Sequence, residues 1–210
     1  ERFDYLNDGD PVSGRSLGVE GIWLTPIFKS PSYHKYDVED YYAIDKSFGT
    51  EDDLRELISL CHERNVKIIL DLPINHTSIK NTWYALFAAA RQNKDASSEY
   101  YDLYSCSDSA SSDGRIFSKI SGTEEYYECN FSADMPELDF SNGSVVEKMK
   151  QVAEYYLDMG VDGFRFDAAK YIFLGEEKRN VEFWNDYIGY LREKNSDIFT
   201  VAEVWAHDSI

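Results

Sequence analysis

Short apolar runs and segments of helical periodicity alternate along most of the chain. Four apolar runs predict buried strands, at residues 19–24, 66–71, 163–167 and 199–203. Apolar residues spaced three and four positions apart predict helices over residues 50–65, around 145–157 and around 184–191. Thr50 is placed to cap the first helix, and Gly160 follows the second as a C-terminal cap. Because strands that alternate with helices form parallel sheets, the pattern predicts an α/β fold.

Two stretches interrupt this alternation. Residues 27–50 include an aromatic and acidic segment and are long for a simple connection. Residues 77–134 are rich in Ser, Asp, Asn and Tyr, which predicts an inserted subdomain. The chain therefore divides into residues 1–76, 77–134 and 135–210, of which the first and last form one α/β unit. Its four strands are too few to close an eight-stranded barrel.

Polar residues follow the predicted strands at the points where the strands end. Active-site residues in parallel α/β proteins gather at the carboxyl ends of the strands. The polar residues in such positions are Tyr36 and Asp37 beyond the first strand, Asp71, Asn75 and His76 at the second, Asp167 at the third and Glu203 at the fourth. We therefore expect these side chains to share one edge of the sheet.

Asp167 and Glu203 form the most informative pair, because each ends an apolar run that does not otherwise explain an acid. A retaining glycosidase uses one carboxylate as nucleophile and a second as general acid/base, about 5 to 5.5 Å apart. A single Asp after a strand is also a common helix cap. Arg165 favours the catalytic interpretation, since a residue two positions before Asp167 faces the same side and can keep its carboxylate ionised.

Composition narrows the classes of partner. The formal net charge of −18, from 39 acidic and 21 basic residues, argues against nucleic acid and against an anionic membrane surface. It favours a neutral or cationic ligand. Sixteen Tyr and twelve Phe beside many carboxylates suit a sugar site, since rings stack on pyranose faces and carboxylates accept hydroxyl protons.

Neither a membrane segment nor a metal-binding cysteine pattern is predicted. No run of eighteen apolar residues occurs, and the first residues lack the basic and apolar segments of a signal peptide. The three cysteines are Cys61, Cys106 and Cys129. A disulfide between Cys106 and Cys129 stays open, so the cysteines leave the compartment undecided.

Several motifs together resemble those of the α-amylase family of glycoside hydrolases. Asp71–His76 resembles the family motif after the third barrel strand, Gly163–Lys170 the motif at the fourth, and Glu203–Trp205 the motif at the fifth. Gly21–Pro26 resembles the second strand, and Met135–Asp139 is similar to the motif that closes the inserted domain B. The resemblance implies part of a (β/α)8 TIM barrel, from about strand 2 to strand 5, with an irregular domain B after the third strand.

The resemblance also implies a role for each matching residue. Asp167 would be the nucleophile, Glu203 the acid/base with a raised pKa, and Arg165 would orient Asp167. Substrate binding is implied for five others: His76 through a sugar hydroxyl, Tyr36 by stacking on the reacting sugar, Asp37 at the nonreducing end, Lys170 on the leaving-group side, and Asp71.

Two further expectations concern groups that the chain supplies only in part. Asn75 matches a calcium-ligand position of many relatives, although Tyr171 stands where many relatives have His. The third acid of the family, an Asp after the seventh strand, lies outside the 210 residues. We therefore expect an incomplete catalytic domain that is inactive alone and whose open sheet edges favour dimers or aggregates.

The leading functional hypothesis is a retaining hydrolase of α-1,4-glucosidic bonds in starch or maltooligosaccharides. The run His34–Asp37 also resembles neopullulanase and cyclomaltodextrinase sequences, and Asp37 would suit an oligo-α-glucosidase. A non-enzymatic alternative is the amylase-like ectodomain of an amino-acid transporter heavy chain, whose members have lost catalytic acids. A carbohydrate-binding module would explain the aromatic content but would leave the paired acids without a role.

Overall fold

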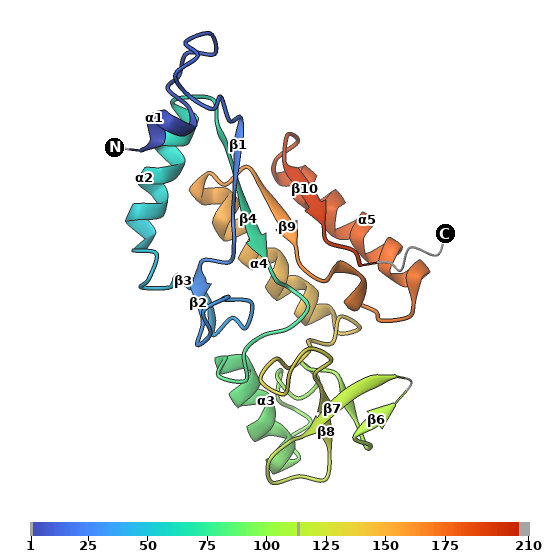
Figure 1. The fold of residues 1–210 in the computed structure, drawn as a ribbon. Coiled ribbons are helices and arrows are strands. Elements are labelled where there is room, and N and C mark those ends of the chain that lie inside the picture. Colours follow the sequence, from blue (N-terminus) through green and yellow to red (C-terminus); the bar gives the residue numbers. More distant parts are fainter. Residues whose placement is uncertain (1, 113, 206–210) are drawn as a thin grey trace.

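The computed structural model describes residues 2–112 and 114–205 and is built around one parallel sheet (Figure 1). Its strands, in spatial order, are β1 (Gly21–Leu24), β4 (Lys67–Leu72), β9 (Gly163–Phe166) and β10 (Phe199–Ala202). All four predicted strands are confirmed. The first is shorter than predicted, although the carbonyl of Glu20 still accepts a hydrogen bond from the Lys67 N–H at 2.9 Å.

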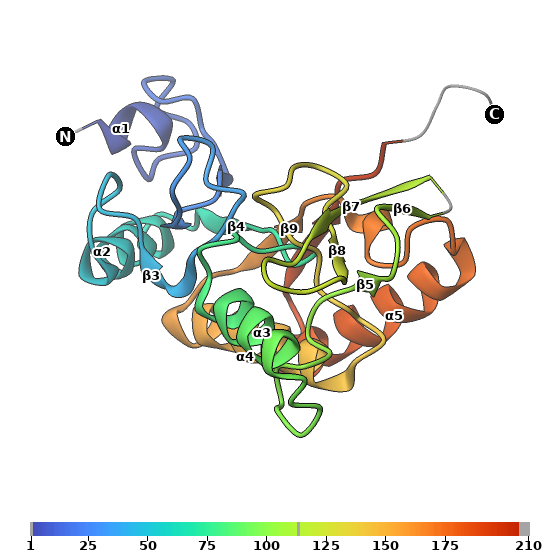
Figure 2. The same cartoon turned by 90° about the horizontal axis from the view of Figure 1, so that it is seen from below.

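The helices lie along one face of this sheet (Figures 1 and 2). They are α2 (Glu51–His62), α4 (Gly143–Met159) and α5 (Glu177–Lys194), with the short α1 (Phe3–Leu6) and the 3-10 turn η1 (Ala169–Tyr171) beside them. Thr50 and Asp53 form a reciprocal capping box at the start of α2, and Gly160 caps α4 with φ 105°. Helix α2 ends earlier than predicted, because the chain turns through Asn65 at φ 57°.

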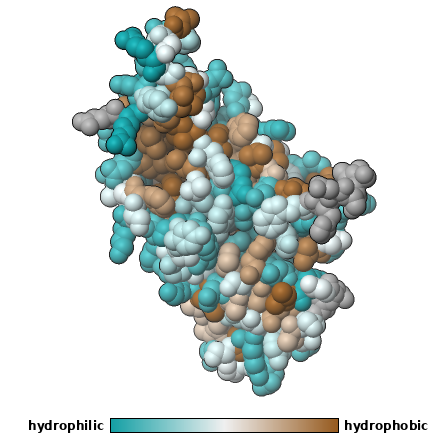
Figure 3. Space-filling model, in the orientation of Figure 1, coloured by the Kyte–Doolittle hydropathy of each residue, from teal (hydrophilic) through white to brown (hydrophobic). Residues whose placement is uncertain are grey.

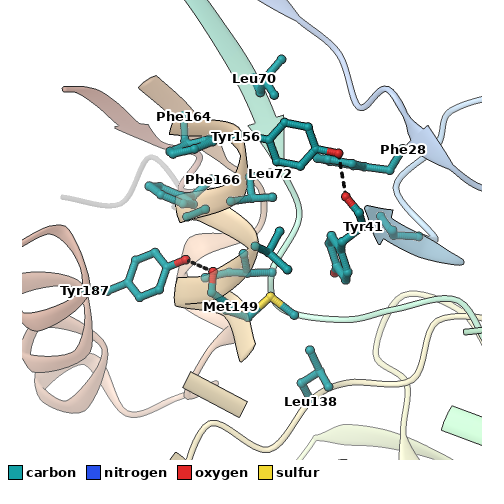
Figure 4. Packing of buried hydrophobic residues seen from close by; sticks show 14 of the residues in the cluster. Phe28, Tyr41, Leu70, Leu72, Leu138, Met149, Tyr156, Phe164, Phe166 and Tyr187 are labelled. Carbon is teal, nitrogen blue, oxygen red and sulfur yellow. Dashed lines mark hydrogen bonds between the residues drawn. The ribbon is translucent and has the colours of Figure 1, made fainter. Parts of the chain in front are cut away.

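The core fills the space between the sheet and these helices (Figure 4). Alternate side chains of β4 and β9 point toward the helices and are buried, namely Ile68, Leu70, Leu72, Phe164 and Phe166. Tyr156 of α4 and Tyr187 of α5 pack among them and donate hydrogen bonds to the carbonyls of Tyr41 (2.6 Å) and Met149 (2.8 Å). The buried tyrosine hydroxyls are thus satisfied, as a tightly packed core requires.

The two stretches that interrupt the strand and helix pattern are more ordered than predicted. Within 27–50, β2 (Phe28–Lys29) pairs with β3 (Asp40–Ile44). Within 77–134, helix α3 (Thr82–Asn93) lies beside an antiparallel sheet of β5 (Cys106–Ser107), β8 (Tyr126–Glu128), β7 (Arg115–Lys119) and β6 (Ser111–Ser112). This insertion lies beyond the carboxyl ends of β4 and β9 (Figure 1). Its boundaries at 77 and 134 stay predictions.

The sheet is open at both sides, since β1 and β10 are its edge strands. Trp23, Phe199 and Val201 on these strands are 52%, 53% and 43% exposed, and an apolar area lies near β1 and α2 (Figure 3). Cys106 and Cys129 do not form the disulfide that the sequence left open, because all three cysteines are free thiols. Among residues 2–112 and 114–205, no helix is long and apolar enough to cross a membrane.

Candidate active site

The register of the sheet brings the predicted acids to one edge and one face. Asp71 of β4 and Val201 of β10 both pair with Arg165 of β9. Because side chains two residues apart face the same side of a strand, Asp167 and Glu203 continue this face beyond Arg165 and Val201. Asp71 lies inside β4, whereas the sequence placed it at the strand end.

Gly163 allows the two strands that carry the acids to approach each other closely. A Cβ atom at this position would lie 2.1 Å from the carbonyl oxygen of Phe199 on β10. No larger residue fits between the two backbones without moving them. The glycine at the start of β9 therefore sets the spacing that brings Asp167 and Glu203 together.

Arg165 binds three carboxylates, and not only the one predicted from sequence. Its Nη1 donates to Asp71 Oδ2 at 2.8 Å and to Asp167 Oδ1 at 2.9 Å, and its Nη2 lies 2.5 Å from Glu203 Oε1. The Arg165 side chain is only 11% exposed and that of Asp71 is fully buried. The guanidinium therefore orients the nucleophile candidate, the acid/base candidate and Asp71 together.

One arginine cannot neutralise three acids, and the pKa of Asp167 reflects this. Burial raises the pKa of Asp167 to about 7, with a side-chain hydrogen bond to Glu203 adding to the rise, although the Arg165 charge lowers it. Burial also raises the pKa of Asp71. Arg165 lowers the pKa of Asp167 as expected, but desolvation raises it by more, and the ionisation of Asp167 by Arg165 stays a prediction.

The contact between Asp167 and Glu203 has a chemical consequence. Both carboxylates bind the guanidinium of Arg165, so they are neighbours, and the proximity of Glu203 contributes to the raised pKa of Asp167. A retaining glycosidase requires two such neighbouring carboxyl groups, one as nucleophile and one as acid/base. Oε2 of Glu203 is buried without a partner, so an acceptor or proton donor is free to meet a substrate atom.

Tyr36 lies directly beside this cluster. Its hydroxyl donates to Asp71 Oδ2 at 3.0 Å and accepts from Arg165 Nη1 at 3.3 Å. The ring of Trp23 lies 5.6 Å from the same guanidinium. No role was predicted for Trp23, although its side chain lies on the same face of the sheet as that of Arg165.

His76 is buried beside the insertion and is close enough to Asp37 to be influenced by its charge. Burial lowers the pKa of His76 to about 4, although the Asp37 carboxylate opposes the shift. The imidazole is therefore neutral at physiological pH. Among the described residues, Nε2 of His76 is buried without a hydrogen-bond partner. A neutral ring nitrogen without a partner suits a sugar hydroxyl, which can both donate and accept.

Lys170 and three aromatic rings lie around the remaining sides of the candidate site. Lys170 Nζ donates to the carbonyl of Trp205, two residues beyond Glu203. The ring of Phe131, from the insertion, lies 5.2 Å from His76 and 4.7 Å from Tyr171. Phe131 was not predicted, because nothing in its polar sequence neighbourhood distinguishes it.

Asn75 lies next to a pair of buried acids. Burial raises the pKa of Glu137 to about 8, the charge of Glu128 adds to the rise, and a side-chain hydrogen bond from Asn75 opposes it. Glu128 accepts from Arg115 Nη1 at 3.4 Å, and Asn130 donates to both acids. Amide and carboxylate oxygens are the hard ligands that calcium prefers, and calcium at Asn75 stays a prediction. Among residues 2–112 and 114–205 no three acids, histidines or cysteines group around a metal position.

A parallel α/β sheet with an arginine and three acids at its carboxyl edge places the chain among the barrel enzymes in fold. All of residues 1–210 match the family model of the α-amylase catalytic domain, and the chain belongs to that family. It is 38% identical over 208 residues to "Alpha-amylase 3" of Dictyoglomus thermophilum, covering 99% of this chain and 39% of that protein. It is 35% identical over 226 residues to a 4-alpha-glucanotransferase of Thermotoga neapolitana, covering 99% and 47%.

The solved structures agree with this assignment. The crystal structure of the α-amylase from H. orenii superposes with a TM-score of 0.84 at 40% identity, over 98% of this chain and 42% of that one. The predicted fold class, part of a (β/α)8 barrel, is confirmed. The chain spans between 39% and 47% of the length of these three proteins.

Proposed function

We propose that the complete protein hydrolyses α-1,4-glucosidic bonds in starch or maltooligosaccharides and retains the anomeric configuration. The observation that carries this proposal is that Asp167 and Glu203 both bind the guanidinium of Arg165, at 2.9 Å and 2.5 Å. A pair of acids that shares one proton supplies both an ionised nucleophile and a protonated acid at the same pH.

The geometry supports a double displacement. The ionised Asp167 attacks the anomeric carbon while Glu203 gives its proton to the departing glycosidic oxygen, so a covalent glycosyl ester forms and the aglycone leaves as an alcohol. Glu203, now ionised, removes a proton from water, which attacks the same carbon and releases Asp167. Arg165 stays bonded to both acids and stabilises each as it becomes charged.

The remaining predicted residues would position the sugar. Tyr36 would stack on the reacting unit while its hydroxyl stays anchored on Asp71. His76 would donate from Nε2 to a hydroxyl, which its neutral state and missing partner support. Asp37 would accept from hydroxyls at the nonreducing end, and Lys170 would contact the leaving-group side. Holding the reacting atoms in line supplies much of the rate enhancement of such enzymes.

The decisive experiment replaces Asp167 in the complete protein. Asp167→Asn should abolish turnover of maltooligosaccharides while binding persists, because the amide keeps the size of the side chain but cannot attack. Asp102→Asn is the matched control, since Asp102 also accepts from an arginine at 2.7 Å but is 69% exposed and lies in the insertion. Proton NMR of the first product should show the α-anomer. An initial β-anomer, or full activity of Asp167→Asn, would rule out the mechanism.

The alternatives differ in measurable products. Endo cleavage of amylose gives a ladder of lengths, whereas a neopullulanase, cyclomaltodextrinase or oligo-α-glucosidase would prefer short or branched substrates such as maltotriose. A transporter heavy chain or a binding module would show no turnover at all. The buried and hydrogen-bonded acids favour an enzyme over both, because a costly desolvated acid pair has no purpose in a protein without chemistry.

Calcium at Asn75 stays a prediction. Asn75 and Glu137 would hold the ion, and a bound cation would supply a charge-based link between the insertion and the loop after β4. The backbone bridge between His76 and Glu137 already joins the same two segments. Thermal unfolding of the complete protein with calcium and with a chelator tests this directly. A calcium-dependent rise in melting temperature that Asn75→Ala removes would support the site, and identical curves would exclude it.

A further inference from the structure

The carboxylate of Asp37 is held through only one of its two oxygens. Its Oδ1 accepts a hydrogen bond from the Ser30 hydroxyl at 2.7 Å and another from the Ser32 hydroxyl. Asp37 is 5% exposed and Ser30 is 8% exposed. Within residues 2–112 and 114–205, no group donates a hydrogen bond to Oδ2 of Asp37. The two serines thus fix the orientation of the carboxylate and leave one oxygen available.

The loop that carries both serines is rigid for a second, independent reason. Lys35 adopts a left-handed conformation at φ 67°, and its ammonium binds Asp45 Oδ2 at 2.8 Å and the carbonyl of Ser30 at 3.3 Å. Both partners of this ion pair are buried, at 9% and 7% exposure. The buried ion pair of Lys35 with Asp45 offsets the cost of the left-handed backbone conformation at Lys35 and so holds the turn in place. The position of Ser30 relative to Asp37 is therefore set before any ligand binds.

The segment of Asp37 lies beside that of His76, since the Ser78 N–H donates a hydrogen bond to the Val38 carbonyl at 2.9 Å. Among the described residues, Nε2 of His76 is buried and has no hydrogen-bond partner. A carboxylate oxygen and a ring nitrogen that both lack a partner match sugar hydroxyl groups, each of which can donate and accept. Leaving Nε2 of His76 buried and unpaired costs free energy that a ligand recovers.

We propose that Ser30 and Ser32 are positioning residues that aim Asp37 at a hydroxyl of the nonreducing-end sugar when that sugar is the reacting unit. This inference rests on the proposed function. It adds that two serines of the Asp37 loop determine which sugar hydroxyl is recognised. Ser32 also lies 3.1 Å from His34 Nδ1, so its hydroxyl is held in place from the other side. Without the serines, the Asp37 side chain turns away and one hydroxyl loses its acceptor.

The test uses the complete protein and compares kcat and KM on maltotriose for four variants. Ser32→Ala and the double variant Ser30→Ala/Ser32→Ala should lower kcat/KM about tenfold, mainly through KM, since a binding contact is lost. Ser32→Thr keeps the hydroxyl and should restore the wild-type value. Ser13→Ala is the control, because its hydroxyl donates to Asp8 at 2.6 Å far from the site in sequence, and its kinetics should match wild type.

A second readout separates positioning from a general loss of structure. The substrates are nitrophenyl α-glycosides in which one hydroxyl of the reacting unit is removed at a time. Removing the hydroxyl that Asp37 binds should lower kcat/KM less in the double variant than in wild type. An equal loss for every analogue, or wild-type kinetics in both alanine variants, would overturn the inference. If wild type itself shows no turnover, the proposed function fails instead, so the two failures are distinguishable.

Discussion

Arg165 is the residue whose replacement tests the site most directly, and Arg165→Gln removes its charge while keeping a polar side chain of similar reach. The guanidinium now bonds Asp167 at 2.9 Å and Glu203 at 2.5 Å, besides Asp71. A hydrogen bond to a charged group contributes about 1.5 to 3 kcal/mol. Losing the bonds to the two catalytic candidates should therefore cost about 4 kcal/mol, which corresponds to about 10³-fold in kcat/KM.

The same substitution should change the pH dependence in a defined direction. The charge of Arg165 lowers the pKa of Asp167, which burial otherwise raises and which settles at about 7. Without the arginine this pKa rises, and the nucleophile is ionised only at higher pH. The acid limb of the kcat/KM profile should thus move upward, as measured on a soluble maltooligosaccharide with the complete protein.

Arg91→Gln is the matched control for the loss of a buried arginine. The Arg91 side chain is also 11% exposed and also bonds two acids, Asp102 at 2.7 Å and Glu125 at 3.2 Å, but it lies on α3. Its kcat/KM and acid limb should stay close to wild type. If Arg165→Gln kept kcat/KM within tenfold of wild type and left the acid limb in place, the assignment of Arg165 to both acids would be refuted.

Three further predictions concern stability and the extent of the catalytic unit. Burial would raise the pKa of Asp162, but hydrogen bonds from Lys67 (2.8 Å), the Ile68 N–H (2.9 Å) and His62 (2.8 Å) outweigh it and lower the value. Asp162→Asn should therefore cost about 2 kcal/mol in denaturant unfolding at pH 7, and the difference should fade as the pH falls below about 4, the unfolded-state pKa. Gly163→Ala should destabilise the protein by about 3 kcal/mol in the same assay, since its Cβ would meet the carbonyl of Phe199; an unchanged midpoint would contradict the close approach. The 210-residue chain alone should not hydrolyse starch and should elute as oligomers in gel filtration, and a monomeric, active segment would contradict this.

The spacing of apolar residues and the capping residues predicted those helices and strands that depend on residues close together in the sequence. The spacing of apolar residues gave the strands of the parallel sheet and the three long helices, and Thr50 caps α2 as predicted, because capping involves only residues three apart. The alternation of side chains along a strand also placed Arg165 and Asp167 on one side. Order inside the insertion was missed, since its short strands pair in a polar segment without clear periodicity.

The sequence by itself determined that two acids and an arginine stand at the carboxyl ends of neighbouring strands, because these positions follow from strand periodicity and parallel order. Only the tertiary structure decided how the charges are shared. Asp71 is 94 residues from Arg165, and it competes with Asp167 for the same guanidinium. Burial by distant segments then raises the pKa of Asp167, which no local pattern reports. Desolvation and long-range pairing depend on which remote residues meet, and folding alone settles that.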